Sequence, residues 1–372
     1  MRFMFAIVLA SCALATSANA QQPTLKDAYS GCFLVGAALN PAQFTETDAK
    51  EAAIIKAQFN TISPENVLKW ERIHPEPTRY DFGPADQYVE FGQRNHMLII
   101  GHNLVWHAQT PMWVFEDKEG KPVSREVLLK RLHDHIQTVV GRYKGKIKGW
   151  DVVNEVVDED GTLRQSPWMK IVGPDYIQKA FEYAHEADPK AELYYNDYNL
   201  ENEVKRKGGL DLVRTLKAKG APITGVGLQE HVDLDWPSTD QLNATIDEFA
   251  KLGMKVMITE LDVDVLPSPF NEKTADVSQQ VASNPKYNPY PDALPESVQQ
   301  RITNRWAELF RIYSSHCGVV TRVTLWGVSD KDSWKNNWPI RGRTNYPLLF
   351  DRNDDPKPAV KAVLEAAPKK PS

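Results

Sequence analysis

The segment IKGWDVVNE, residues 147–155, has the composition of a buried β-strand with a polar end. Its tryptophan and two valines favour extended structure, and a largely apolar run is typical of a strand that is covered on both faces. The run is followed directly by an amide and a carboxylate, Asn154 and Glu155. In α/β barrels and open sheets, functional groups gather where parallel strands end. The segment therefore predicts one strand of an α/β fold and one edge of a functional site.

Similar apolar runs recur along the chain, and each is followed by a segment with the period of an amphipathic helix. The other runs cover residues 32–39, 59–66, 97–107, 191–199, 223–231, 254–265 and 319–330. The helical patterns cover residues 41–58, 85–95, 124–143, 175–187, 203–219, 238–252, 297–316 and 357–366. Eight strand–helix pairs without a linker predict a single (β/α)8 TIM barrel. A doubly wound sheet is the alternative, but no glycine-rich turn follows the first strand.

Capping residues divide several of these segments. Thr45, Ser124 and Ser238 are expected to start helices, because their hydroxyls can accept hydrogen bonds from free backbone N–H groups. Gly220 and Gly253 are expected to follow helix ends. One segment has no period: residues 266–296, after the seventh predicted strand, are rich in proline. Such a long loop is often functional, and we expect it at the catalytic face.

Composition restricts the possible partners. The 372-residue chain is 42% hydrophobic and 25% charged, which is typical of a globular protein. Its formal net charge of −5, with no basic run, makes nucleic acid a poor partner. We expect a monomer without a membrane span. The ten tryptophans exceed what a core requires, because indole is difficult to bury completely.

Residues 1–20 have the features of a signal peptide. Arg2 precedes the apolar run FMFAIVLASCALA, and small residues precede the expected cleavage after Ala20. This predicts a secreted or periplasmic protein whose catalytic barrel spans residues 21–372. A lipoprotein site at Cys12 is the less favoured alternative.

The mature chain would keep two cysteines, Cys32 and Cys317. Both adjoin apolar runs, which favours buried free thiols, although export would permit a disulfide.

The predicted strand ends carry carboxylates, amides, histidines and indoles. They are Glu65, Asn66, Lys69, His102, Trp106, Gln109, Asn154, Glu155, Asn196, Asp197, Gln229, His231, Glu260, Asp262, Trp326 and Trp334. Flat indole faces suit a sugar ring, and the polar groups suit its hydroxyls. Glu155 and Glu260 lie on the fourth and seventh strands, a pair suited to glycoside hydrolysis.

The two carboxylates require different environments. Glu155 would be the acid and then the base, and Glu260 the nucleophile. His231 could keep Glu260 ionised, Asp262 could orient His231, and Asn154 could donate to a sugar hydroxyl. A metal site is the rival hypothesis, but no histidine pair has a suitable spacing and no HExxH motif is present. A serine hydrolase would need a GxSxG elbow, which is missing from the sequence.

Seven blocks, in order, resemble the signatures of glycoside hydrolase family 10. They are ENVLKW (65–70), GHNLVWH (101–107), WDVVNE (150–155), YYNDYN (194–199), GLQEH (227–231), ITELDV (258–263) and TLWGVSDKDSW (324–334). The resemblance implies a cofactor-free, retaining endo-β-1,4-xylanase that acts on xylan and xylo-oligosaccharides. It implies that Glu155 is the acid/base, Glu260 the nucleophile, and His231 and Asp262 the pair that orients it. It implies substrate binding by Glu65, Asn66, Lys69, His102, Trp106, Gln109, Asn154, Asn196, Gln229, Trp326 and Trp334, the first six on the glycone side.

Two other functions stay open. A β-1,4-glucanase or an exo-acting xylan or cellobioside hydrolase could use the same scaffold, because a single hydroxymethyl group separates glucose from xylose. A carbohydrate-binding barrel without activity is less favoured, because both carboxylates are present.

Overall fold

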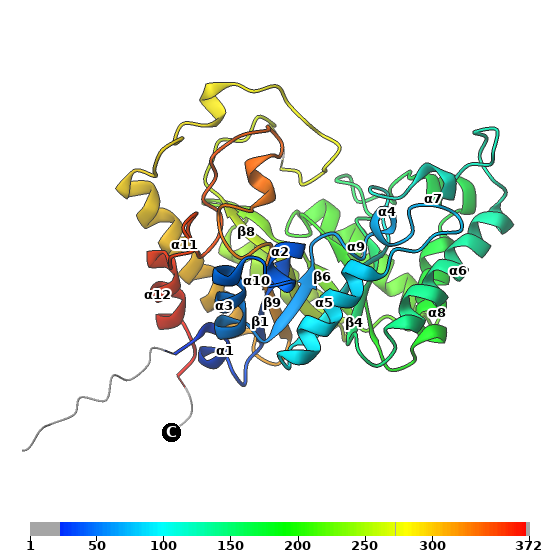
Figure 1. Cartoon of the computed structure of the whole chain (residues 1–372), viewed down its shortest axis with the longest axis horizontal. Coiled ribbons are helices and arrows are strands. Elements are labelled where there is room, and N and C mark those ends of the chain that lie inside the picture. The colour runs from blue at the N-terminus through cyan, green and yellow to red at the C-terminus, as the bar shows by residue number, and fades with distance from the viewer. Residues whose placement is uncertain (1–22, 272, 370–372) are drawn as a thin grey trace, which may run out of the picture.

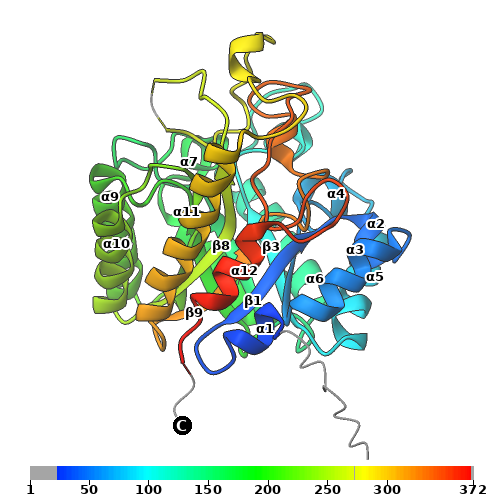
Figure 2. The ribbon, with the colours of Figure 1, turned by 90° about the vertical axis from the view of Figure 1, so that its left-hand side faces the viewer.

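Eight parallel strands close into a barrel that is surrounded by helices (Figures 1 and 2). The computed structural model describes residues 23–271 and 273–369, so the predicted signal peptide, the cleavage site and Cys12 lie outside the described residues. The barrel strands are β1 (Leu34–Leu39), β2 (Thr61–Pro64), β3 (Leu98–Val105), β4 (Gly149–Asn154), β5 (Glu192–Asp197), β6 (Gly225–Leu228), β8 (Lys255–Asp264) and β9 (Val320–Leu325). They pair in this order, and the β1–β9 pairing closes the ring. The (β/α)8 barrel predicted from the sequence is confirmed.

The helices cover the outside of the barrel and its rims. They are α1 (Leu25–Ala28), α2 (Pro41–Phe44), α3 (Ala49–Gln58), α4 (Trp70–Ile73), α5 (Gly83–Arg94), α6 (Arg125–Arg142), α7 (Pro167–Val172), α8 (Asp175–Ala187), α9 (Glu203–Ala218), α10 (Thr239–Lys251), α11 (Glu296–Ser315) and α12 (Pro358–Glu365). Ser124 and Ser238 cap α6 and α10 as predicted. Gly220 and Gly253 follow α9 and α10 with φ of 72° and 73°, a region that favours glycine. No helix within the described ranges is long and apolar enough to cross a bilayer.

The first predicted helix is divided in two, and Thr45 does not start a helix. Thr45 is the C-terminal cap of α2, and its hydroxyl donates back to the carbonyl of Pro41. Asp48 caps α3 instead, by accepting a hydrogen bond from the Glu51 N–H at 3.0 Å. Both Thr and Asp favour helix starts, and the apolar period alone does not reveal the turn between the two helices.

The prediction that Cys32 and Cys317 are free thiols is wrong, because they form a disulfide with a Cα–Cα distance of 4.8 Å. Cys32 precedes β1 and Cys317 precedes β9. These two strands are neighbours where the barrel closes, so residues 285 positions apart in the chain become adjacent.

The sixth predicted strand is shorter than expected. The β6 strand ends at Leu228, and His231 begins a separate strand, β7 (His231–Asp233), which pairs further along β8. Glu230 lies between them with φ of 57°, a left-handed conformation that interrupts the strand. This break aligns His231 with Asp262 in the β7–β8 register.

The two ends of the barrel differ in their coverings. The segment between β8 and α11 rises above the C-terminal ends of the strands, where it is drawn in yellow (Figure 2). At the opposite end, α1 lies beside α12, and the Tyr29 hydroxyl donates to the carbonyl of Val363 at 2.6 Å.

Candidate active site

A pocket of about 230 Å³ lies at the C-terminal ends of the strands. It is lined by Glu65, Asn66, Lys69, His102, Trp106, Gln109, Asn154, Glu155, Gln229, His231, Glu260, Ala275, Val277, Trp326 and Trp334. The structure thus brings together all of the strand-end residues predicted from the sequence except Asn196, Asp197 and Asp262, which are buried and do not line the pocket.

Glu155 is fixed in the pocket by three donors. Its Oε2 accepts a hydrogen bond from Trp106 Nε1 at 2.8 Å. Its Oε1 accepts from Gln229 Nε2 and Asn154 Nδ2, both at 3.1 Å. The residue follows β4 with φ of 57°, so the chain turns as soon as the strand ends. The carboxyl group is therefore presented to the pocket in one orientation.

The environment of Glu155 favours its protonated form. Burial and then the negative charge of Asp197 raise its pKa to about 7, although the donors from Trp106 and Gln229 oppose this shift. Asp197 is held by a fully buried ion pair with Lys205 at 3.0 Å. A carboxyl group with this pKa can donate a proton near neutral pH.

Glu260 has the opposite character. Burial alone would raise its pKa, but the hydrogen bond with His231, the charges of His102 and His231, and Asn196 together lower it. The Oε2 atom of Glu260 lies 3.3 Å from His231 Nε2, and its Oε1 accepts from Asn196 Nδ2 at 2.7 Å. Glu260 therefore ionises at a lower pH than Glu155 does.

His231 connects Glu260 to a second carboxylate. Its Nδ1 lies 3.0 Å from Oδ2 of Asp262, which also accepts a hydrogen bond from Trp334 Nε1 at 2.7 Å. Burial disfavours the imidazolium, but Asp262 and Glu260 outweigh it and raise the pKa of His231 to about 9. The imidazole is thus charged and can donate from both nitrogens.

Asn196 does not line the pocket, although the sequence predicts that it binds substrate. Its side chain is fully buried and donates to Asn154 Oδ1 and to Glu260 Oε1, each at 2.7 Å, while its own oxygen accepts from Thr259. Because Asn154 also contacts Glu155, the two asparagines connect the two carboxylates.

The opposite wall of the pocket is centred on Lys69. Its ammonium group donates to Asn66 Oδ1 and Gln109 Oε1 at 3.1 and 3.0 Å, and it lies 4.9 Å from the centre of a Trp106 ring. Burial lowers the pKa of Lys69, and the nearby carboxylates, Glu260 first, counteract this effect. This wall presents donors to a polar ligand.

Two pocket residues are missing from the sequence prediction. Ala275 and Val277 belong to the long segment after β8. Its position directly after a barrel strand indicates the catalytic face, but nothing in its composition distinguishes these small apolar residues from their neighbours. Among the described residues, no group of three or more His, Cys, Asp or Glu side chains is arranged to hold a metal ion.

Comparison with known proteins agrees with this geometry. Residues 24–366 match the model of glycosyl hydrolase family 10. The chain belongs to glycosyl hydrolase family 10. Its relatives include endo-1,4-beta-xylanase A of Xylanibacter ruminicola, 47% identical, with 92% of this chain and 93% of that protein covered. A beta-1,4-xylanase of Dictyoglomus thermophilum is 42% identical, with 92% and 91% covered.

Solved structures of the same family are also similar. A GH10 endoxylanase retrieved from a sugarcane soil metagenome superimposes with a TM-score of 0.89 and 47% identity. The alignment covers 92% of this chain and 99% of that one. As a glycoside hydrolase of family 10, the protein brings two carboxyl groups whose pKa values are shifted in opposite directions into a single pocket.

Proposed function

We propose that the protein is a secreted endo-1,4-β-xylanase that hydrolyses internal β-1,4-xylosidic bonds of xylan with retention of configuration. Two features support this proposal. The chain belongs to a glycoside hydrolase family whose similar members carry xylanase names. The pocket holds the carboxyl pair that a double displacement requires.

In the first step, Glu260 attacks the anomeric carbon while Glu155 donates its proton to the glycosidic oxygen. The bond to the leaving sugar breaks, and a covalent glycosyl–Glu260 intermediate forms. His231, held by Asp262, keeps Glu260 ionised before the attack.

In the second step, the ionised Glu155 takes a proton from a water molecule, and the resulting hydroxide attacks the anomeric carbon. The glycosyl–Glu260 bond breaks, and both carboxyl groups return to their starting states. The two inversions restore the original configuration.

The single observation that carries the proposal is the opposite direction of the two pKa shifts. Burial and Asp197 raise the pKa of Glu155 to about 7. The pKa of Glu260 is lowered despite its burial, and His231 makes the largest contribution to this lowering. This is the division of roles that acid-assisted nucleophilic catalysis requires.

Proton NMR of the sugar first released from xylo-oligosaccharides tests the mechanism. The β-anomer should appear first and then mutarotate. Initial release of the α-anomer would indicate an inverting enzyme, whose carboxyl groups are wider apart than the roughly 5–5.5 Å expected here.

We also propose export and a monomeric state. The N-terminal signal pattern and the disulfide both fit an oxidising compartment outside the cytosol. Mass spectrometry of protein from the culture medium should find a chain that begins at Gln21, and light scattering should give the mass of one chain. A lipid-modified Cys12 would contradict free secretion.

A further inference from the structure

Lys205 is a fully buried cation behind the catalytic pocket, in the first turn of α9. Its Nζ lies 3.0 Å from Asp197 Oδ1, 3.1 Å from Glu159 Oε1 and 3.5 Å from the centre of the Tyr198 ring. Burial lowers the pKa of this lysine, but Asp197, Tyr198 and Glu159 outweigh the effect and raise it. The ammonium group is therefore kept charged by the groups around it.

Asp197 connects this cation to the segment that carries Glu155. Its Oδ2 accepts hydrogen bonds from the N–H of Val157 at 3.3 Å and from the Tyr195 hydroxyl at 2.7 Å. Its Oδ1 accepts from the N–H of the next residue at 3.0 Å and faces Lys205. Because Val157 is two residues past Glu155, Asp197 holds the turn that directs the acid into the pocket.

The backbone of Glu155 is held on both sides of the same turn. Its N–H donates to the carbonyl of Asn196 at 2.9 Å, next to Asp197 in β5. Its carbonyl accepts from Arg164 Nε at 2.9 Å, and the same guanidinium lies 3.2 Å from Asp158. A displacement of Asp197 would therefore be transmitted directly to the acid.

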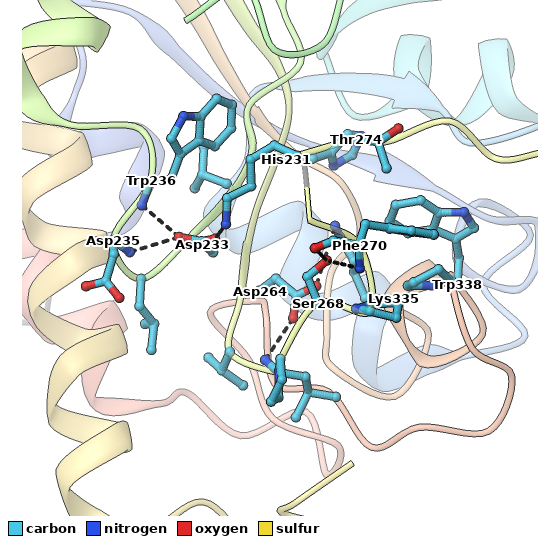
Figure 3. Close-up of a pocket in the computed structure, with 18 of the residues that line it drawn as sticks. His231, Asp233, Asp235, Trp236, Asp264, Ser268, Phe270, Thr274, Lys335 and Trp338 are labelled. Atoms are coloured by element: carbon cyan, nitrogen blue, oxygen red, sulfur yellow. Dashed lines mark hydrogen bonds and ion pairs between the residues drawn. The ribbon is translucent and has the colours of Figure 1, made fainter. Parts of the chain in front are cut away.

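Lys205 and Asp197 lie behind the pocket walls. They do not line the catalytic pocket, nor the larger pocket of about 390 Å³ beside it, which shares His231 with the catalytic one (Figure 3). Both side chains are fully buried. Any effect of Lys205 on the reaction therefore passes through Asp197 and Glu155.

Two carboxyl groups close together in a buried site are unfavourable when both are ionised. After burial, the charge of Asp197 is the largest cause that raises the pKa of Glu155 to about 7. An unpaired Asp197 would raise it further, and the positive charge of Lys205 offsets part of that effect. The ion pair thus allows a buried carboxylate to lie behind the acid without preventing the acid from ionising in the second step.

Other titratable groups also surround Glu155 and Lys205. On the pocket side, Glu155 faces Glu260 and Lys69. Behind it, the surrounding groups are His107, Asp158, Glu159, Arg164, Tyr176, Tyr195, Tyr198, Glu201 and Asp276. These groups remain in place when Asp197 or Lys205 is replaced, so a difference between such variants reports on the ion pair.

We propose that Lys205 is a positioning residue for the acid/base: its ammonium group fixes Asp197, and with it the turn after Glu155, and offsets the negative charge behind the acid. This inference rests on the proposed role of Glu155 as the proton donor. It assigns a buried helical lysine to the reaction, although the lysine does not line the pocket.

Two variants of the ion pair should move the alkaline limb of the pH–activity profile in opposite directions. That limb falls as Glu155 loses its proton. D197N keeps the size of the side chain and removes the negative charge, so the limb should move down by about one pH unit. K205M leaves the negative charge uncompensated, so the limb should move up by about one pH unit. The assay is kcat/KM for an aryl xylobioside with a poor leaving group, from about pH 5 to about pH 10.

K357M is the matched control. Lys357 is buried and lies 3.0 Å from Asp330, and its ammonium group also donates to the carbonyls of Tyr346 and Leu348. It thus forms a buried ion pair of the same kind, and none of these partners contacts Glu155. K357M should leave the alkaline limb in place.

The direction in which the limb moves separates the two possible roles of Lys205. A purely structural role would lower kcat/KM at every pH and leave the limb in place. Unmoved limbs in D197N and K205M, movement of both in the same direction, or an equal movement in K357M would overturn the proposal. D197N leaves Lys205 paired with Glu159. If K205M yields no soluble protein, K205Q takes its place, because an amide can still donate to Asp197 without carrying charge.

Failure of the proposed function gives a different result, namely no turnover of the xylobioside by the unmodified protein. Carbon-13 NMR of labelled glutamate side chains then follows the carboxyl group of Glu155 directly, and the loss of its signal in E155Q assigns it. The titration midpoint should move down in D197N and up in K205M. Equal midpoints, or midpoints that move in the same direction, would overturn the proposal.

Discussion

Replacement of Asp262 by Asn should shift the acidic limb of the pH–activity profile. Asp262 is the carboxylate behind His231, with Oδ2 3.0 Å from Nδ1, and His231 in turn lies 3.3 Å from Glu260. The variant keeps the size of the side chain but removes its charge. Burial lowers the pKa of His231, and the charge of Asp262 no longer counteracts this effect in the variant. His231 should therefore lose its proton at a lower pH.

The size of the expected effect follows from how far the pKa of His231 is raised. The pKa of His231 is raised from 6.5 to about 9, which corresponds to about 3 kcal/mol at 1.36 kcal/mol per unit. Without Asp262, burial dominates, and the pKa of His231 should fall well below 6.5, into the acidic range in which Glu260 titrates. Glu260 then titrates beside a neutral imidazole, and we expect its pKa to rise by about one unit.

The sign of the effect is determined by the role of Glu260. Attack requires the ionised carboxylate, so a higher pKa leaves less active enzyme at a given acidic pH. The lower limb of kcat/KM should move up by about one pH unit, and activity on the steep part of that limb, below the pKa of Glu260 in both proteins, should fall about tenfold.

The assay is kcat/KM for an aryl xylobioside between pH 3 and 9. Asp264→Asn is the matched control, because Asp264 lies on the same strand near Lys335 but forms no ion pair with His231. Its acidic limb should stay in place. An unmoved limb in Asp262→Asn, or equal movement in both variants, would refute the proposed role of His231.

Three further predictions concern the catalytic pair, sugar preference and stability. Glu260→Ala should abolish turnover of every substrate, whereas Glu155→Ala should retain the first step on aryl glycosides with good leaving groups. Equal losses of activity of Glu155→Ala on substrates with good and poor leaving groups would contradict these roles. Trp334→Ala should lower kcat/KM for an aryl xylobioside and raise the ratio of kcat/KM for the cellobioside to that for the xylobioside, within the roughly 10- to 200-fold that one small group can contribute. An unchanged ratio would show that other residues distinguish glucose from xylose. The double variant Cys32→Ser, Cys317→Ser should lose up to about 5 kcal/mol of unfolding free energy in a denaturant titration, and equal stability would show that the cross-link contributes nothing.

Much of the fold can be predicted from the sequence because each barrel strand is a short segment of mostly apolar residues. The segment that contains β4 is largely apolar up to Asn154, with Asp151 as the exception, because the strand is buried on both faces. The break between β6 and β7 is harder to predict, because Glu230 adopts a positive φ without being glycine. Tertiary contacts, such as the 2.6 Å hydrogen bond from Tyr313 to Glu230, act there against local preference.

The catalytic pocket can also be predicted in large part, since its polar residues follow strand after strand. The sequence does not separate residues that line the pocket from those, such as Asn196, that lie behind its wall. Lys335 and Arg343 lie in the long segment after β9, where neither period nor strand position indicates burial. Their burial depends on tertiary packing, which no linear pattern records. The same is true of the Cys32–Cys317 pair.

The location of α1 and α12 has a practical consequence. The helix α1 lies at the end of the barrel opposite the pocket, and α12 runs along the side of the barrel towards that end (Figure 2). The disulfide joins the segments that precede β1 and β9. A binding module fused beyond residue 369, or a tether to a solid support at that position, would leave the mouth of the pocket pointing away from the attachment. The enzyme could thus be immobilised while a polymer still reaches it from solution.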